Sequence, residues 1–165
     1  MKSKCLAAIL SVIATAGSAQ WMHEESGGAF DGSPTQLAMA ANLDYGFGLR
    51  CTDEFDLVAI FVTPEQIDQD TLDRMTALLP TVLIRVDDNE PFELPSEGLV
   101  APQGASYLGD APADLAVQIA GAKTSVSVAI SLLGEIYHET RFGSSGSTRA
   151  ANLVIENCGL DPADS

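Results

Sequence analysis

Apolar positions in this 165-residue chain follow a period of two over several short segments, or form short apolar runs between turn residues. Both patterns are typical of β-strands with at least one buried face. The predicted strands are residues 36–41, 46–51, 57–62, 81–86, 91–94, 124–132 and 136–142. Turn signals between neighbours, such as Asp44-Tyr45-Gly46 and Gly134-Glu135, favour antiparallel pairing.

Helical spacing is clearest near the C-terminus, in a helix that stops at Gly159. The residues on its common side are Ala150, Leu153, Val154 and Asn157, and the segment 144–147 supplies hydroxyls for its N-terminal cap. Shorter helical segments are predicted at 112–120 and within 65–80. Glycine, proline and polar residues make 20–34 and 95–106 irregular, with Trp21 anchoring the first of these to the core.

The first 19 residues have the pattern of an export signal. Lys2 and Lys4 precede an apolar run over residues 6–16, and small residues at 17–19 predict cleavage after Ala19. That run is shorter than the roughly 20 residues of a membrane span. Cys5 precedes the run, so it cannot become a lipidated first residue of the mature chain. We therefore expect a periplasmic or secreted protein without a membrane anchor.

Removal of residues 1–19 leaves 165 − 19 = 146 residues, which is typical of one domain. The predicted elements make residues 20–165 a single, mainly β domain of the α+β class. We expect a compact antiparallel β-sandwich with the C-terminal helix packed on the sheet.

The mature chain is strongly acidic. The signal removes two of eight basic residues and none of 23 acidic ones, so the remaining formal charge is 6 − 23 = −17. Such a field repels nucleic acid phosphates and anionic membrane surfaces, which excludes nucleic acid as a partner. It suits either a solvated acidic surface or a docking face for a basic partner.

Two cysteines, Cys51 and Cys158, follow the signal, and an exported protein reaches an oxidising compartment. Only one intramolecular bridge is then possible, and we predict that it forms; two separately buried thiols are the alternative. The bridge would join a strand near the start of the fold to the last turn of the final helix. A zinc site is not expected, because His23 and His138 lie at unrelated positions without close ligand pairs.

Two further groups of residues could bind ions. Carboxylates at the tip of the predicted 81–94 hairpin, Asp87, Asp88 and Glu90, could hold calcium or form an ordinary acidic turn. The segment before the last helix, with Ser145, Gly146, Ser147 and Arg149, could hold a small anion or only cap the helix. No cofactor is expected.

No catalytic residue can be assigned from the sequence. His138 has Glu139 beside it, but neighbouring strand residues point to opposite faces. A hydrolase that pairs His138 with a distant serine stays an alternative, and a cleft converging on His138 would favour it. Arg85 and Asp87 project from one face of a strand, where they could form an ion pair or a recognition spot.

The residues that carry a resemblance to known families are Trp21, Ser26, Asp31, Leu49-Arg50-Cys51, Val82-Leu83-Ile84-Arg85-Val86-Asp87-Asp88, Phe142, Gly146, Ser147, Ala150 and Cys158. In this order the chain resembles the type VI secretion-associated VasI proteins and, more loosely, exported proteobacterial proteins of the invasion-associated locus B type. The resemblance implies a periplasmic, mostly β domain with no catalytic residue to transfer. We therefore expect a non-enzymatic accessory or binding protein with a protein partner in the envelope; the alternatives are the hydrolase and an anion- or calcium-binding module.

Overall fold

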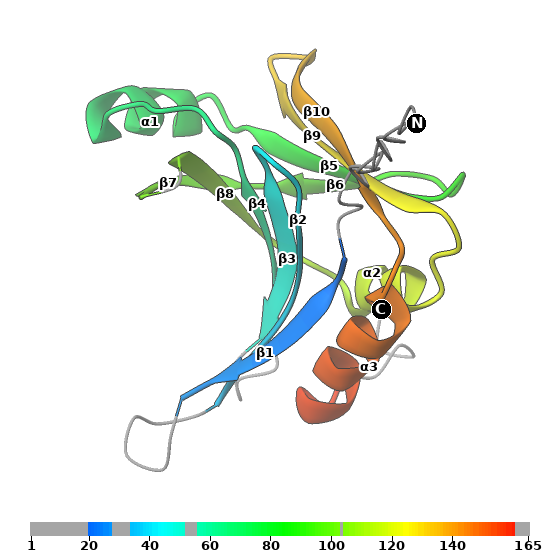
Figure 1. The fold of residues 1–165 in the computed structure, drawn as a ribbon. Coiled ribbons are helices and arrows are strands. Elements are labelled where there is room, and N and C mark those ends of the chain that lie inside the picture. The colour runs from blue at the N-terminus through cyan, green and yellow to red at the C-terminus, as the bar shows by residue number, and fades with distance from the viewer. Residues whose placement is uncertain (1–19, 28–33, 52–55, 103, 161–165) are drawn as a thin grey trace, which may run out of the picture.

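Two antiparallel sheets form the body of the protein, which is represented by a computed structural model that describes residues 20–27, 34–51, 56–102 and 104–160 (Figure 1). The six-stranded sheet has the order β1-β2-β3-β4-β8-β7, and the four-stranded sheet has the order β10-β9-β5-β6. The elements are β1 (Met22–Ser26), β2 (Thr35–Ala41), β3 (Gly46–Cys51), β4 (Leu57–Val62), α1 (Gln69–Thr76), β5 (Thr81–Val86), β6 (Phe92–Pro95), β7 (Glu97–Ala101), β8 (Gly104–Asp110), α2 (Ala113–Ala120), β9 (Ser125–Leu132), β10 (Glu135–Gly143) and α3 (Ser147–Asn157). The predicted signal lies outside the described residues.

The inner faces of the two sheets supply one apolar core. On β5 every second side chain is buried. On β9 Val126, Val128 and Ile130 are buried in the alternation that the sequence predicts, and Ala129 is buried as well. The residues concerned are Val82, Ile84, Val86, Val126, Val128 and Ile130, and they share a core with Phe47, Leu49 and Phe61 of the larger sheet. The predicted antiparallel sandwich is therefore confirmed.

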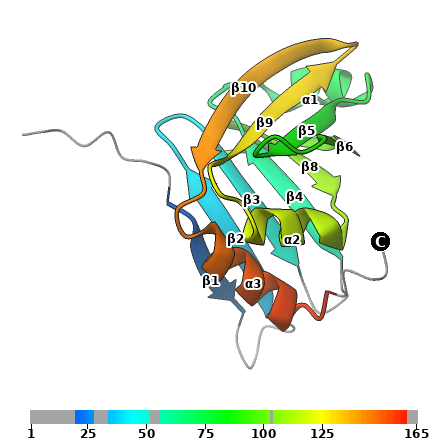
Figure 2. The same ribbon diagram turned by 90° about the vertical axis from the view of Figure 1, so that its right-hand side faces the viewer.

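Helices α2 and α3 pack on each other and cover the part of the larger sheet that the smaller sheet leaves open (Figure 2). Helix α3 lies on β1, β2 and β3 and buries Ala150, Ala151 and Val154, so the predicted packing of the C-terminal helix on the sheet is confirmed. Within the described ranges, no helix is long and apolar enough to cross a membrane.

Cys51, the last residue of β3, and Cys158, the C-cap of α3, form a disulfide. Their Cα atoms are 6.3 Å apart, within the usual range for a bridge. The predicted pairing is confirmed, and separate buried thiols are excluded. The bridge fastens the end of the last helix to the sheet.

Trp21 is buried and closes one end of the sandwich. Its indole Nε1 donates to the Gly143 carbonyl over 2.9 Å, its backbone N donates to the Ser145 carbonyl over 2.8 Å, and its ring packs edge-on against Phe47. The predicted anchoring role of Trp21 is confirmed. The prediction of an irregular segment around it is wrong for 22–26, which pair with β2 as an edge strand. Both faces of this strand are largely exposed, so no alternation marks it.

The prediction of a loop over residues 95–106 is also wrong, since β7 and β8 occupy most of it. Its glycines are present because other chain segments approach closely. Gly104 has φ +145°, and a Cβ there would overlap the Thr63 carbonyl oxygen. A Cβ on Gly98 would lie 2.6 Å from the Leu72 side chain of α1. The composition of residues 95–106 is therefore that of a loop, although the segment forms two tightly packed strands.

Helices α1 and α3 begin with different N-caps. Helix α1, expected within 65–80, has Asp68 as its N-cap, and the Asp68 carboxylate accepts from Thr71 N over 2.8 Å. Helix α3 has Gly146 as its N-cap with φ +83° and no side-chain cap, so hydroxyl capping is wrong there. A Cβ at Gly146 would lie 2.7 Å from the Trp21 carbonyl oxygen, which requires glycine at this position.

Candidate functional site

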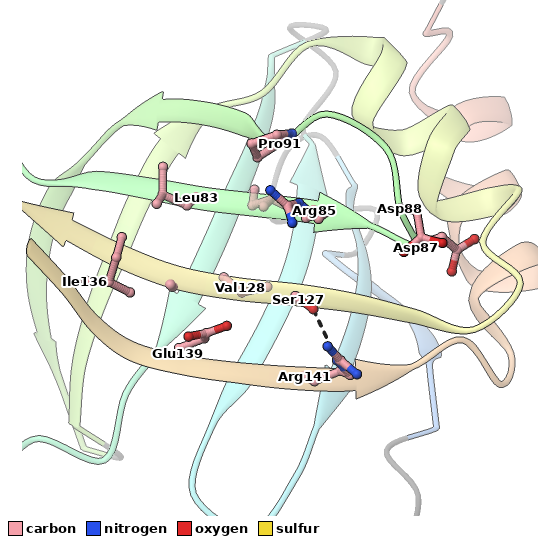
Figure 3. Close-up of a pocket in the computed structure, with 12 residues that line it drawn as sticks. Leu83, Arg85, Asp87, Asp88, Pro91, Ser127, Val128, Ile136, Glu139 and Arg141 are labelled. Carbon is pink, nitrogen blue, oxygen red and sulfur yellow. Dashed lines mark hydrogen bonds between the residues drawn. The ribbon is translucent and has the colours of Figure 1, made fainter. Parts of the chain in front are cut away.

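A groove of about 280 Å³ lies on the outer face of the four-stranded sheet (Figure 3). The inward residues of β5 and β9 and Phe142 of β10 lie in the core, and outward residues of these three strands line this groove. Its polar lining is Arg85, Asp87, Asp88, Ser127, Glu139 and Arg141, and its apolar lining includes Leu83, Pro91 and Ile136. The groove thus contains both members of the predicted Arg85–Asp87 pair.

Strand register places Arg85, Ser127 and Arg141 in one row across β5, β9 and β10. Arg141 Nε donates to the Ser127 hydroxyl over 3.3 Å, and both arginines are exposed. In the described part of the chain, neither guanidinium lies within 4 Å of a carboxylate. The row therefore presents two cationic groups with free N–H donors, which is the geometry that binds carboxylates.

Asp87 has a structural role that does not involve Arg85. It has φ +51°, a conformation that aspartate tolerates better than most residues, and its carboxylate accepts from the backbone of the segment that leads into β9. The donors are Lys123 N at 2.8 Å, Thr124 N at 2.8 Å, Ser125 N at 3.0 Å and the Thr124 hydroxyl at 2.6 Å. These hydrogen bonds, that of the Thr124 hydroxyl first, hold the pKa of Asp87 well below its usual range.

We expect Asp87→Asn to lower the free energy of unfolding at neutral pH, and to lower it by less in acid. A carboxyl group whose pKa is lower in the folded state stabilises the fold above its unfolded pKa of about 3.9, and this contribution declines as the pH falls toward the folded pKa. Urea unfolding at about pH 7 and about pH 3 measures the difference. Asp88→Asn, at an exposed neighbour, is the matched control. An equal deficit of Asp87→Asn at both pH values would contradict the assignment.

The two predicted ion sites receive no new support from the geometry. Asp87 already uses both carboxylate oxygens, and among the described residues no three His, Cys, Asp or Glu side chains lie close enough to hold a metal ion. At the start of α3 the Ser147 hydroxyl is buried without a hydrogen-bond partner, while Ser145, Gly146 and Arg149 are exposed. Calcium at Asp87, Asp88 and Glu90 and an anion at Ser145, Gly146, Ser147 and Arg149 stay predictions.

His138 lies in a second cavity, which contains no serine among its described lining residues. A register shift in β10 between Tyr137 and Thr140 gives His138 φ +53°. Its Nε2 lies 3.0 Å from Glu65 Oε2, and its Nδ1 lies 3.5 Å from the Tyr45 hydroxyl. The partners of the imidazole are therefore a carboxylate and a phenol, rather than the serine of the hydrolase alternative.

The remaining lining residues were not found from the sequence. Ser127 and Arg141 have the outward positions of alternating strands, so the alternation marked them as exposed, but only the register shows that both meet Arg85. Glu65 follows β4 by three positions and carries no local signal that connects it to His138.

Comparisons with known proteins agree with this fold. No protein-family model and no curated protein matches the chain. The crystal structure of invasion associated protein B from Bartonella henselae matches with a TM-score of 0.53 at 11% sequence identity, over 85% of this chain and 94% of that chain. The two proteins share a fold.

This likeness confirms, at the level of the fold, the predicted resemblance to proteins of the invasion-associated locus B type. A protein of unknown function from Burkholderia pseudomallei has a TM-score of 0.37 at 15% identity, over 64% of this chain and 56% of that chain, which is too low to show a shared fold. The resemblance to type VI secretion-associated proteins stays a prediction.

Proposed function

We propose that this protein is an exported, non-enzymatic accessory protein of the cell envelope, which binds an acidic segment of a partner protein in the groove on the outer face of the four-stranded sheet. The observation that carries the proposal is the row of Arg85, Ser127 and Arg141. Two guanidinium groups on either side of a hydroxyl can hold a carboxylate by charge-assisted hydrogen bonds.

The partner's chemistry follows from the lining of the groove. Beside the arginine row lie Leu83, Pro91 and Ile136, and the Ile136 side chain is 51% exposed. Burial of such an exposed apolar side chain favours association. A segment that alternates acidic and aliphatic residues would fill both parts of the groove.

The negative charge of the chain opposes an acidic partner, and Asp88 and Glu139 carry part of that charge into the groove itself. With 23 acidic and eight basic residues the whole chain has a formal charge of −15. At physiological salt the field of exposed charges is screened over about 8 Å, whereas the two guanidinium groups act at contact distance. Long-range repulsion would lower the association rate and would favour segments that fit the row closely.

Export is supported by the pattern of residues 1–19 and by the disulfide between Cys51 and Cys158. Disulfides of this structural kind persist in oxidising compartments such as the periplasm. The disulfide does not contact the sheet that carries the groove. We therefore expect the domain to bind its partner with the disulfide formed.

The binding test uses residues 20–165 with the disulfide formed, and a capped, fluorescent hexapeptide of alternating glutamate and leucine. We expect saturable binding that is at least about tenfold weaker when glutamine replaces glutamate, because each charge-assisted hydrogen bond contributes about 1.5–3 kcal/mol. Arg85→Gln combined with Arg141→Gln should weaken binding by a similar factor.

Arg74→Gln is the matched control, because Arg74 is an exposed arginine on α1 outside the groove. It should leave the dissociation constant unchanged. Equal binding of the glutamate and glutamine peptides, or an equal effect of Arg74→Gln and the double variant, would contradict the proposal.

A further inference from the structure

The cavity beside His138 is walled by both sheets and by α1, and it has a volume of about 260 Å³. Tyr107 comes from β8 of the larger sheet, Ile130 and His138 come from the smaller sheet, and Met75 comes from α1. Glu65 lies in the connection between β4 and α1. The cavity combines apolar walls with a few convergent polar groups, as small-molecule sites commonly do.

The carboxylate of Glu65 is the charged centre of this cavity. It lies 3.0 Å from His138 Nε2, and the two side chains keep 36% and 24% of their surface exposed, so both can be reached from solvent. Among the described lining residues there is no lysine or arginine. A ligand that carries negative charge would therefore meet Glu65 without a permanent cation to offset the repulsion.

Tyr107 adds a polar atom that has no partner. Its side chain is fully buried, and its hydroxyl makes no hydrogen bond to any residue that the structure describes. Tyr107 and Glu65 line the same cavity. Burial, and then the charge of Glu65, raise the pKa of Tyr107. A buried hydroxyl without a partner is costly, so a ligand that hydrogen-bonds to it gains affinity.

We propose that this cavity binds a small amine in its ammonium form, with the ammonium between the Glu65 carboxylate and the Tyr107 hydroxyl. An ammonium has three donors and no acceptor, and these two oxygens can both accept. The hydrocarbon part of the amine packs against Met75, Pro80 and Ile130. The acidic field of the chain concentrates cations near its surface.

This site is independent of the proposed function, because the cavity and the groove share no lining residue. Arg85→Gln combined with Arg141→Gln should therefore weaken peptide binding by about tenfold or more without changing amine binding. Glu65→Gln should weaken amine binding without changing peptide binding. Failure of one proposal is therefore distinguishable from failure of the other.

The test is an NMR titration of oxidised residues 20–165 with three probes that have the same butyl chain: n-butylammonium, 1-butanol and butyrate. We expect saturable shifts of the Tyr107 and His138 resonances with n-butylammonium. The dissociation constant for 1-butanol should be at least about tenfold higher, and that for butyrate higher still, because the alcohol lacks the charge and the acid is repelled by Glu65.

Variants then assign the two contacts. Glu65→Gln should raise the dissociation constant for n-butylammonium to that for 1-butanol, and Tyr107→Phe should weaken ammonium binding about three- to tenfold through one lost hydrogen bond. Glu156→Gln, at an exposed glutamate of α3 outside both the cavity and the groove, should leave the dissociation constants for n-butylammonium and 1-butanol unchanged.

The comparison of the three probes needs no variant, so it stands even if a substitution disturbs folding. Absence of saturable shifts with n-butylammonium would overturn the proposal. So would equal affinity for 1-butanol, or unchanged ammonium binding by a folded Glu65→Gln protein.

Discussion

Loss of the disulfide between Cys51 and Cys158 should lower the free energy of unfolding by about 2–5 kcal/mol, the usual cost in a small secreted domain. The two residues are 107 positions apart. In the chain-entropy model a bridge that closes a loop of this length restricts the unfolded chain by about 5 kcal/mol. Helix α3 also depends on the bridge, because the residues that it buries are mostly small, including Ala150 and Ala151. Its own packing therefore contributes little.

Urea unfolding of the oxidised chain and of Cys51→Ala combined with Cys158→Ala measures this effect. Added reductant should destabilise the natural chain and leave the double variant unchanged. Hydrogen exchange should show α3 losing protection first on reduction, because the bridge holds its end. Equal stability with and without reductant, or two free thiols in protein isolated under oxidising conditions, would contradict the prediction.

Replacement of Trp21 by alanine should cost about 3–5 kcal/mol, as for other large-to-small changes in a core. The indole is 3% exposed, it packs edge-on against Phe47 with ring centroids 5.9 Å apart, and its Nε1 donates to the Gly143 carbonyl. Loss of the ring leaves a cavity and an unpaired carbonyl at the end of β10. It also releases the start of β1, because that strand follows Trp21 directly.

Thermal and urea unfolding check this expectation, with two controls. Trp21→Phe keeps much of the apolar area and loses the N–H donor, so it should cost less than the alanine variant. Met22→Ala changes a neighbour that is 56% exposed and should change stability by about 0.5 kcal/mol or less. If Trp21→Ala were as stable as Met22→Ala, the ring would not be part of the core.

The position of Trp21 has a consequence for export. Cleavage after Ala19 would leave only Gln20 before the first core residue. A signal peptidase that cut two residues later would remove Trp21 and with it the contacts to Phe47 and Gly143. These contacts therefore require that any cleavage of the chain falls before residue 21.

The predicted strands were those in which one face is buried and the other is not. In β9 that difference is written into the sequence as a period of two, and the turn residues Gly134-Glu135 predicted its antiparallel pairing with β10. Strand β1 has two exposed faces and so has no period. Strand β8 is buried on both sides, and glycines that allow close backbone approach made it resemble a loop.

The sites depended on contacts between distant segments, and the sequence could indicate them only in part. Arg85 and Asp87 were found because both are charged residues at the end of an apolar strand. The hydrogen-bond partners of Asp87 were not found, because the backbone donors at 123–125 follow another helix. Arg141 was not found either, because it reaches Ser127 only through the register of β9 and β10.

The sequence by itself determined the class of the fold, the disulfide and the prediction of export. Each of these follows from local periodicity, from the number of cysteines or from one N-terminal pattern. Tertiary structure decided which polar groups meet. Glu65 and His138 are 73 positions apart, and Tyr107 comes from a third segment. Their distances depend on sheet pairing and a bulge in β10, which arise only when the whole chain packs.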